Sequence, residues 1–323
     1  MLDAMDALRQ HFKNFVNYKR AGGVAFVKQE KILRRFIVHC QDYVADTCCL
    51  PKDAVLSWNQ KADHEKINNQ RIRVNTVRSF AEYLQARGIP AYVGELIKSQ
   101  EKGFVPYIFS NNELAKFFNA ADNCNVNNIS PNRSFVMPVI FRLLYSCGLR
   151  VSEATRLRIC DVDLEKGVLT VLDAKFNKDR LIPVDAHMLK RLNEYSSKVL
   201  LFSKPEDPFF PAPKNRFYDP ASVYNAFRVI LWKAGISHGG KGFGPRVHDL
   251  RHTFAVHCLR KWVLSGNNLS VALPYLSTFL GHSGIRHSQI YLRLTAEMYP
   301  DIVEKMERKF DLLPDVGGLY ETN

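Results

Sequence analysis

The segment H-D-L-R-H-T-F-A, residues 248–255, is the most informative stretch of this sequence. Its apolar and polar positions predict a helix from about Asp249 to Leu264. His248 and Arg251 are three positions apart, so a helix that begins here places both side chains on one face, with His252 beside them. The segment therefore predicts a cluster of basic side chains on a helix that is otherwise part of a core.

Four further pieces accompany this segment in order along the chain. They are G-L-R-V-S-E at 148–153, A-K-F-N-K-D-R-L-I-P-V at 174–184, L-G-H-S at 280–283, and Tyr291. Arg150 follows a helix stop at Gly148, from which its side chain can project into a cleft. Two guanidinium forks that point at one place suit a phosphate or its transition state. A tyrosine next to such a cage would attack phosphorus through its phenolate oxygen.

Each of these residues also has an ordinary structural explanation when it is taken alone. Arg150 could form a helix-end ion pair with Glu153, and a single histidine is usually a satisfied structural group. Lys175 and Lys178 at a hairpin tip could simply be solvated, and Tyr291 could be a half-buried aromatic. The sequence offers no acidic cluster suited to a divalent cation and no phosphate-binding loop of the G-x-x-x-x-G-K-[ST] type. We therefore expect neither a metal nor a nucleotide cofactor.

The charge balance indicates a polyanionic partner. The chain has 323 residues, which suggests about two domains at roughly 150 residues each. It has 45 Lys and Arg against 32 Asp and Glu, a net charge of +13, and the parts before and after residue 105 are both positive. Two basic domains could hold a nucleic acid from two sides.

Several protein classes are disfavoured. The seven cysteines form no C-x-x-C pair, which favours reduced intracellular thiols over a disulfide framework or a zinc site. The longest uncharged run, residues 262–285, is too polar and too broken to span a membrane. The charged residues of the first 15 positions argue against a signal peptide.

The predicted fold class is mainly α with a small antiparallel β patch (α+β). Residues 1–90 are expected to form a helical domain, 91–105 a linker, and 106–323 a second domain. Two strands, 168–174 and 181–184, are expected to form a hairpin with a basic tip. Ser110, Asp185 and Asp219 are the expected caps of helices in the second domain.

The order and spacing of the five pieces closely resemble the tyrosine recombinase (phage integrase) family, which includes the Xer, Cre and lambda-type integrases. The resemblance implies a helical, SAM-like core-binding domain followed by a catalytic domain. It implies that Arg150 and Arg251 contact the non-bridging oxygens of the scissile phosphate and that Lys175 protonates the leaving 5′ oxygen. Tyr291 would be the nucleophile and would form a 3′-phosphotyrosyl link.

The same resemblance assigns the remaining residues of the site. His248 and His282 would complete the cage, with His248 as the better candidate for proton transfer. The supporting residues would be Glu153, His252 and Lys178. The arginines would supply the positive charge that a metal provides elsewhere.

By resemblance, the predicted function is site-specific recombination of double-stranded DNA by a two-domain clamp that assembles as a tetramer on two paired sites. A mobile element is the expected context, the cytoplasm and its nucleoid the expected location, and accessory DNA-bending or element-encoded proteins remain open as partners. One alternative is a type IB topoisomerase, which shares the chemistry but relaxes DNA as a monomer. The other is a DNA-binding regulator that has lost catalysis.

Overall fold

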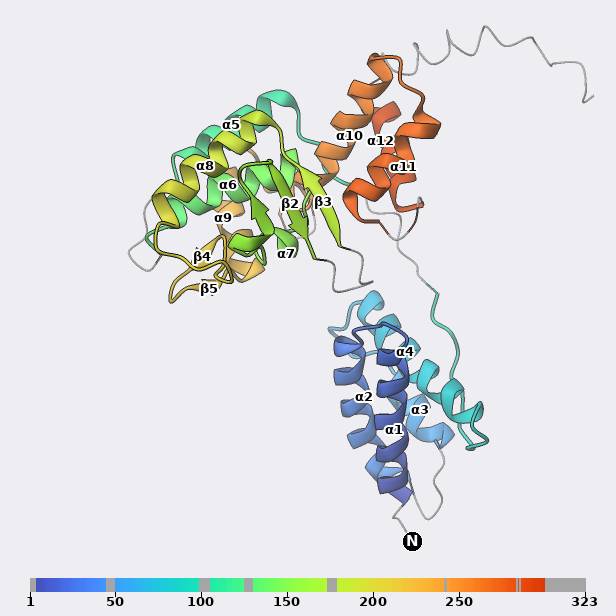
Figure 1. Ribbon diagram of the computed structural model, residues 1–323. Coiled ribbons are helices and arrows are strands. Elements are labelled where there is room, and N and C mark those ends of the chain that lie inside the picture. The colour runs from blue at the N-terminus through green and yellow to red at the C-terminus, as the bar shows by residue number, and fades with distance from the viewer. Residues whose placement is uncertain are drawn as a thin grey trace, which may run out of the picture. The chain divides into compact units, whose positions relative to one another are not determined.

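The computed structural model describes residues 4–44, 50–98, 105–124, 130–172, 179–240, 243–282, 284 and 286–299 of the chain, without the side chains of residues 270, 286, 287 and 296–298. These residues form two compact units, one up to residue 98 and the other from Val105 onward (Figure 1). Both the mainly helical content and the small antiparallel β patch agree with the predicted fold class.

The first unit is a helical bundle in the part of the chain that the structure describes. Its elements are α1 (Ala4–Ala21), α2 (Val27–His39), the 3₁₀ turn η1 (Cys40–Asp42), α3 (Lys52–Asn59) and α4 (Ile67–Gln85). The apolar faces predicted from the helical period are buried, with Leu8 and Phe15 of α1 and Phe36 of α2 fully inaccessible. Phe15 packs on Phe80 of α4, with 5.4 Å between the ring centroids.

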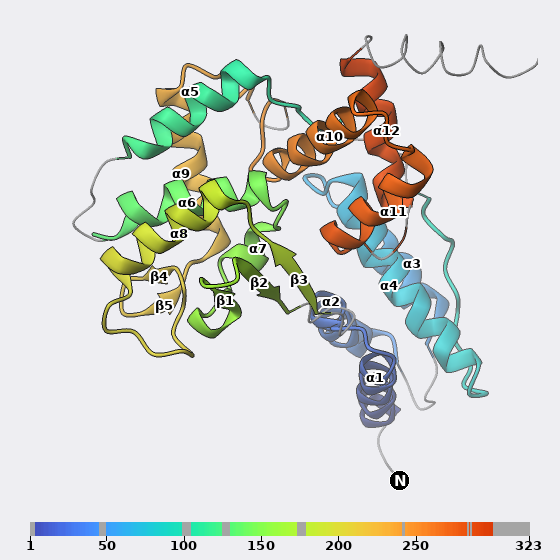
Figure 2. The ribbon, with the colours of Figure 1, turned by 45° about the horizontal axis from the view of Figure 1, so that its top comes forward.

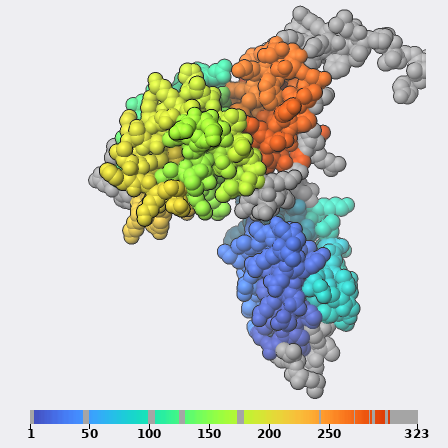
Figure 3. All heavy atoms as spheres, in the orientation of Figure 1, coloured from blue at the N-terminus to red at the C-terminus, as the bar shows by residue number. Residues whose placement is uncertain are grey.

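The second unit contains the remaining helices. They are α5 (Asn111–Asp122), α6 (Arg133–Ser146), α7 (Val151–Ala154), η2 (Ile159–Asp161), α8 (Ala186–Val199), α9 (Pro220–Lys233), α10 (Asp249–Leu264), α11 (Leu269–Leu280) and α12 (Arg286–Met298). α10 packs against both α11 and α12, and the three lie side by side in Figures 1 and 2, where they are orange to red. Figure 3 shows this group in close contact with the rest of the second unit.

The predicted hairpin is present as β2 (Val168–Val171) and β3 (Arg180–Pro183), which pair antiparallel with Leu169 opposite Ile182. Its tip, residues 173–178, lies outside the described residues. The sequence did not predict β1 (Val162–Asp163), which pairs with β2, or the separate pair β4 (Pro211–Ala212) and β5 (Arg216–Phe217). Strands of two residues are too short to show the alternation on which strand prediction depends.

The predicted helix caps are confirmed. The hydroxyl of Ser110 accepts a hydrogen bond from the backbone N–H of Glu113, whose carboxylate accepts in return from the N–H of Ser110. The carboxylate of Asp185 accepts from two backbone N–H groups of α8, and that of Asp219 accepts from the N–H of Ala221. These local bonds explain why all three helices begin where the sequence predicts.

The helices and the cysteines bear on the membrane-protein and disulfide classes that the sequence disfavours. No helix within the described residues is long and apolar enough to cross a membrane. Five cysteines in the described part of the chain are free thiols: Cys40, Cys124, Cys147, Cys160 and Cys258.

Candidate active site

Arg150 and Glu153 lie at the start of α7, immediately after α6 ends. Gly148 makes this connection possible, because its φ of +58° is left-handed and a Cβ there would lie 2.7 Å from side-chain atoms of Phe254 and Leu280. The carboxylate of Glu153 accepts from the backbone N–H of Arg150 at 2.7 Å and from its Nη1 at 2.5 Å. The ion pair considered from sequence therefore exists, and it lies inside the candidate site.

Arg251 is the most buried charged group of the site, with 1 % of its surface exposed. Its Nη1 donates to the carbonyl of Gly148 and its Nη2 to the carbonyl of Leu280, both at 2.6 Å. Its Nε has no hydrogen-bond partner among the described residues. Burial and the nearby Arg150 lower the pKa of Arg251 to about 10, which leaves the guanidinium charged near neutral pH.

The C-terminal end of α11 holds the arginines of the site. Gly281, with φ +65°, closes the helix, since its N–H donates to the carbonyl of Thr278 and the N–H of His282 donates to that of Ser277. The next three carbonyls along the chain have no further residue of α11 to bind. They accept instead from three guanidinium groups: Phe279 from Arg180 at 3.0 Å, Leu280 from Arg251 at 2.6 Å, and Gly281 from Arg150 at 2.8 Å.

Glu153 is the carboxylate that balances this cluster. Burial raises the pKa of Glu153, but the hydrogen bonds and charges of Arg180 and Arg150 outweigh burial and hold the pKa below its usual value. Arg251 lies 3.9 Å from the same carboxylate. Three guanidinium groups around one carboxylate leave a net positive charge, which suits a phosphate.

Tyr291 is fully buried on α12 and faces α10. Its phenolic oxygen lies 3.0 Å from Nδ1 of His252, and its ring stacks on that of His282 with 6.1 Å between centroids. Burial raises the pKa of the Tyr291 phenol, while Arg251 and Arg150 act in the opposite direction. The phenol is therefore protonated near neutral pH, and it is poised beside a nitrogen that can accept its proton.

The histidines are held in the neutral form. Burial, with Arg251 and Arg150 nearby, lowers the pKa of His248 to about 4. Burial, with His248 nearby, lowers the pKa of His252 to about 3, and the two rings lie 4.7 Å apart and perpendicular. A neutral imidazole can accept a proton, whereas an imidazolium cannot.

His282 follows the Gly281 turn and is oriented from α12. Its Nδ1 lies 2.7 Å from the hydroxyl of Ser288, which is itself buried. This contact turns the ring so that it stacks on Tyr291. His282 thus joins the end of α11 to the helix that bears the tyrosine.

The structure brings together most of the predicted set. Seven predicted residues meet at the junction of α7, α10, the α11 turn and α12: Arg150, Glu153, His248, Arg251, His252, His282 and Tyr291. Lys175 and Lys178 lie outside the described residues. The sequence assigned no role to Arg180, although it lies in the same basic hairpin segment as Lys175 and Lys178.

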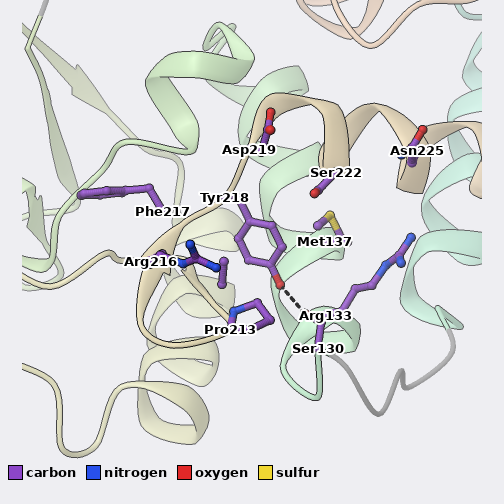
Figure 4. Close-up of a pocket in the computed structure, with 11 residues that line it drawn as sticks. Ser130, Arg133, Met137, Pro213, Arg216, Phe217, Tyr218, Asp219, Ser222 and Asn225 are labelled. Atoms are coloured by element: carbon purple, nitrogen blue, oxygen red, sulfur yellow. Dashed lines mark hydrogen bonds between the residues drawn. The ribbon is translucent and has the colours of Figure 1, made fainter.

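The described residues contain no group of three or more His, Cys, Asp or Glu side chains arranged to hold a metal ion. A separate cavity of about 590 Å³ lies between the start of α6, the β4–β5 pair and the start of α9 (Figure 4). Tyr218 and Ser130 form a hydrogen bond of 2.9 Å at its wall. None of the predicted site residues lines this cavity, so it is separate from the candidate active site.

Comparisons with known proteins agree with this geometry. Residues 108–298 match the phage integrase family. The chain is 30 % identical to "Putative integrase/recombinase y4rE" of Sinorhizobium fredii over 92 % of this chain and 95 % of that protein. It is 28 % identical to the tyrosine recombinase XerA of Pyrococcus horikoshii over 71 % of each.

Two solved structures share the fold. The XerH recombinase in a post-cleavage complex with its palindromic difH substrate aligns with a TM-score of 0.63 at 16 % identity, over 95 % of this chain and 98 % of that one. A lambda integrase tetramer bound to a Holliday junction aligns with a TM-score of 0.57 at 16 % identity, over 86 % and 77 %.

Proposed function

The chain belongs to the phage integrase family, and on that premise we propose that it is a tyrosine-type site-specific recombinase that cleaves and rejoins double-stranded DNA. The observation that carries this proposal is the buried Tyr291 phenol, which lies beside a neutral imidazole and next to a pocket of excess guanidinium charge. Such a pocket can stabilise the negative charge that develops on a phosphate during attack.

Phosphate binding falls to Arg150 and Arg251. The side chain of Arg150 is 34 % exposed, whereas that of Arg251 is 1 % exposed, so the phosphate first meets Arg150. The carbonyls of Gly148, Leu280 and Gly281 fix both forks before the substrate arrives. Groups that are fixed in advance need no reorganisation as the transition state forms.

In the cleavage step, the Tyr291 oxygen forms a bond to phosphorus and the bond from phosphorus to the 5′ oxygen breaks. The phenolic proton passes to an imidazole. His252 is the candidate proton acceptor, because it is the imidazole next to the Tyr291 oxygen. The sequence favoured His248, whose ring packs against that of His252 with 4.7 Å between centroids. The 3′ end of the cut strand remains attached to the tyrosine.

The departing 5′ oxygen needs a proton, and we assign this role to Lys175 from its place in the hairpin motif, with Lys178 as a supporting residue. The phosphotyrosine conserves the energy of the broken bond. A 5′ hydroxyl from a partner strand can therefore reverse the step and rejoin the DNA without an external energy source.

Binding of DNA involves both parts of the chain. We propose that residues 1–90 are a core-binding domain, that 91–105 are a linker and that 106–323 are the catalytic domain. The net charge of +13 suits two domains that contact phosphates along a duplex. The solved lambda integrase tetramer on a Holliday junction supports assembly of four copies on two sites.

We propose that the enzyme acts on a mobile element. The relatives named as integrases or recombinases support a role in moving or resolving a mobile element. The enzyme would act in the cytoplasm, on the nucleoid, with accessory DNA-bending proteins as further partners.

The test is to trap the covalent complex. The substrate is a duplex that contains a target site selected from the DNA flanking the gene, nicked just 3′ of the scissile phosphate so that the short 5′-hydroxyl fragment diffuses away. We expect a covalent adduct that maps to Tyr291. Relaxation of a supercoiled plasmid without paired sites would instead indicate a type IB topoisomerase, and binding without an adduct would indicate a regulator.

A further inference from the structure

Arg180 is a buried arginine of the site that the proposed mechanism leaves unused. It is the first residue of β3, and its side chain is 10 % exposed. Its guanidinium makes three hydrogen bonds: Nη1 and Nη2 donate to Glu153 at 3.1 and 2.8 Å, and Nε donates to the carbonyl of Phe279 at 3.0 Å. A lysine could not make this set, because one ammonium cannot span both carboxylate oxygens and a carbonyl in a fixed plane.

Arg180 and Arg150 share the same carboxylate. Oε1 of Glu153 accepts from Nη1 of both arginines, and Oε2 accepts from Nη2 of Arg180 and from the backbone N–H of Arg150. Arg180 thus supplies two of the four hydrogen bonds that set the carboxylate plane. That plane in turn sets the direction of the Arg150 fork.

The same guanidinium also lies against the turn before His282. A Cβ at Gly281 would be 2.8 Å from Nη1 of Arg180, so the guanidinium in this position packs directly against the glycine. Arg180 therefore touches Glu153, the end of α11 and the Gly281 turn at once. Glu153 and Phe279, which Arg180 joins in this way, lie 27 and 99 positions from it in the sequence.

Burial distinguishes this contact from a surface ion pair. The Glu153 side chain is 8 % exposed, so loss of Arg180 would leave a buried carboxylate with half of its hydrogen bonds. The carboxylate would then compete for Arg150 and draw its fork away from the phosphate.

We propose that Arg180 is a positioning residue for DNA cleavage, which acts through Glu153 to aim the Arg150 guanidinium at the scissile phosphate. The inference rests on the proposed recombinase function. It places the effect of Arg180 on the non-bridging oxygens of the phosphate and not on the leaving 5′ oxygen, although Arg180 begins the strand that follows the hairpin segment with Lys175.

The experiment compares the full-length Arg180→Gln, Arg180→Lys and Arg191→Gln variants in single-turnover trapping on the nicked substrate. Arg191 is a matched control, since it forms a surface pair with Asp122 at 3.8 Å and is 45 % exposed. We expect Arg180→Gln to cleave about 10²-fold more slowly, because misplacement of a binding group by about 1 Å has that effect. We expect intermediate cleavage by Arg180→Lys, wild-type cleavage by Arg191→Gln, and unchanged DNA affinity in all three.

Two altered phosphates identify the side of the reaction that is affected. A methylphosphonate at the scissile position removes the charge of one non-bridging oxygen and with it much of the need for an aimed Arg150. On this substrate the cleavage rate of Arg180→Gln relative to wild type should therefore rise by about tenfold. A 5′-bridging phosphorothiolate needs no proton on its leaving group and should leave the ratio unchanged.

The outcomes are separable. Rescue on the phosphorothiolate, or wild-type cleavage by Arg180→Gln, would overturn the proposal. So would a parallel loss of DNA affinity and of the unfolding midpoint in both Arg180 variants, since that marks a purely structural role. Absence of any adduct with the wild-type protein would instead contradict the recombinase function itself.

Discussion

The phenolic oxygen of Tyr291 lies 3.0 Å from Nδ1 of His252. This contact joins α12 to α10 and brings the proposed nucleophile to a neutral imidazole whose pKa is about 3. Burial lowers the basicity of that imidazole in the free protein. An anionic phosphate that enters the arginine pocket raises it again, because opposite charge favours the imidazolium. We therefore propose that proton transfer from Tyr291 is coupled to substrate binding.

Tyr291→Phe should abolish the covalent adduct while DNA affinity stays nearly unchanged, because phosphate contacts elsewhere supply most of the binding. Adduct formation on denaturing gels and binding by gel shift are the two measurements. Tyr299 is the natural control, since it stacks under Arg260, with 4.3 Å from the guanidinium to the ring centroid, and contacts His257. An adduct that persists in Tyr291→Phe and disappears in Tyr299→Phe would reassign the nucleophile.

The free energy of unfolding should depend on pH through His248 and His252. Their folded pKa values, about 4 and about 3, lie below the usual 6.5, so only the unfolded chain gains protons as the pH falls below about 6.5. The two neutral histidines therefore make their full contribution to the free energy of unfolding above pH 6.5, and this contribution is lost as the pH falls towards 4. Urea unfolding between pH 7 and 4.5 should show this fall, and His252→Gln should reduce its slope. An unchanged slope in the variant would show that His252 does not carry the effect.

Cleavage should proceed at the same rate in excess EDTA, because guanidinium groups occupy the role that a cation would take. DNA binding, by contrast, should weaken steeply with salt as counterions are released. Cleavage rates with and without EDTA test the first statement. Dissociation constants measured over a range of roughly 50 to 300 mM salt test the second. A chelator-sensitive rate restored by Mg²⁺ would indicate a nuclease.

Lys175→Ala should cleave ordinary DNA poorly and regain most activity on a 5′-bridging phosphorothiolate, since proton donation is worth about 10²–10⁴-fold. Lys178→Ala is the matched control and should show a smaller defect without selective rescue. Rescue of Lys178→Ala alone would shift the hairpin register by three residues. If neither variant is rescued, His248 becomes the leading acid.

Gly148→Ala should destabilise the second unit by more than the roughly 1–2 kcal/mol that a left-handed alanine costs. A Cβ there meets Phe254 and Leu280 at 2.7 Å, beside the carbonyl that binds Arg251. Gly235→Ala is the control, because Gly235 has a φ of +67° and no atom within 4 Å of the added Cβ. Equal unfolding midpoints for the two variants would contradict the packing argument.

The sequence by itself determined the helical first unit, the hairpin pairing, the three caps and most of the side chains that meet in the candidate site. These features are local or ordered along the chain: a cap bonds to residues two or three positions away, and a hairpin joins neighbouring strands. The ordered motif around Arg150, Arg251 and Tyr291 also carries the family, because each piece is readable without knowing what it touches.

Only the tertiary structure decided which groups meet. The bonds of Arg150 to Gly281, of Arg180 to Phe279 and of Tyr291 to His252 span 131, 99 and 39 positions. No local period encodes such pairs, because they depend on how α11 and α12 pack against α10. For that reason the contacts of Arg180 with Glu153 and with the end of α11 could not be predicted from sequence, nor could the position of His252, rather than His248, next to the Tyr291 phenol.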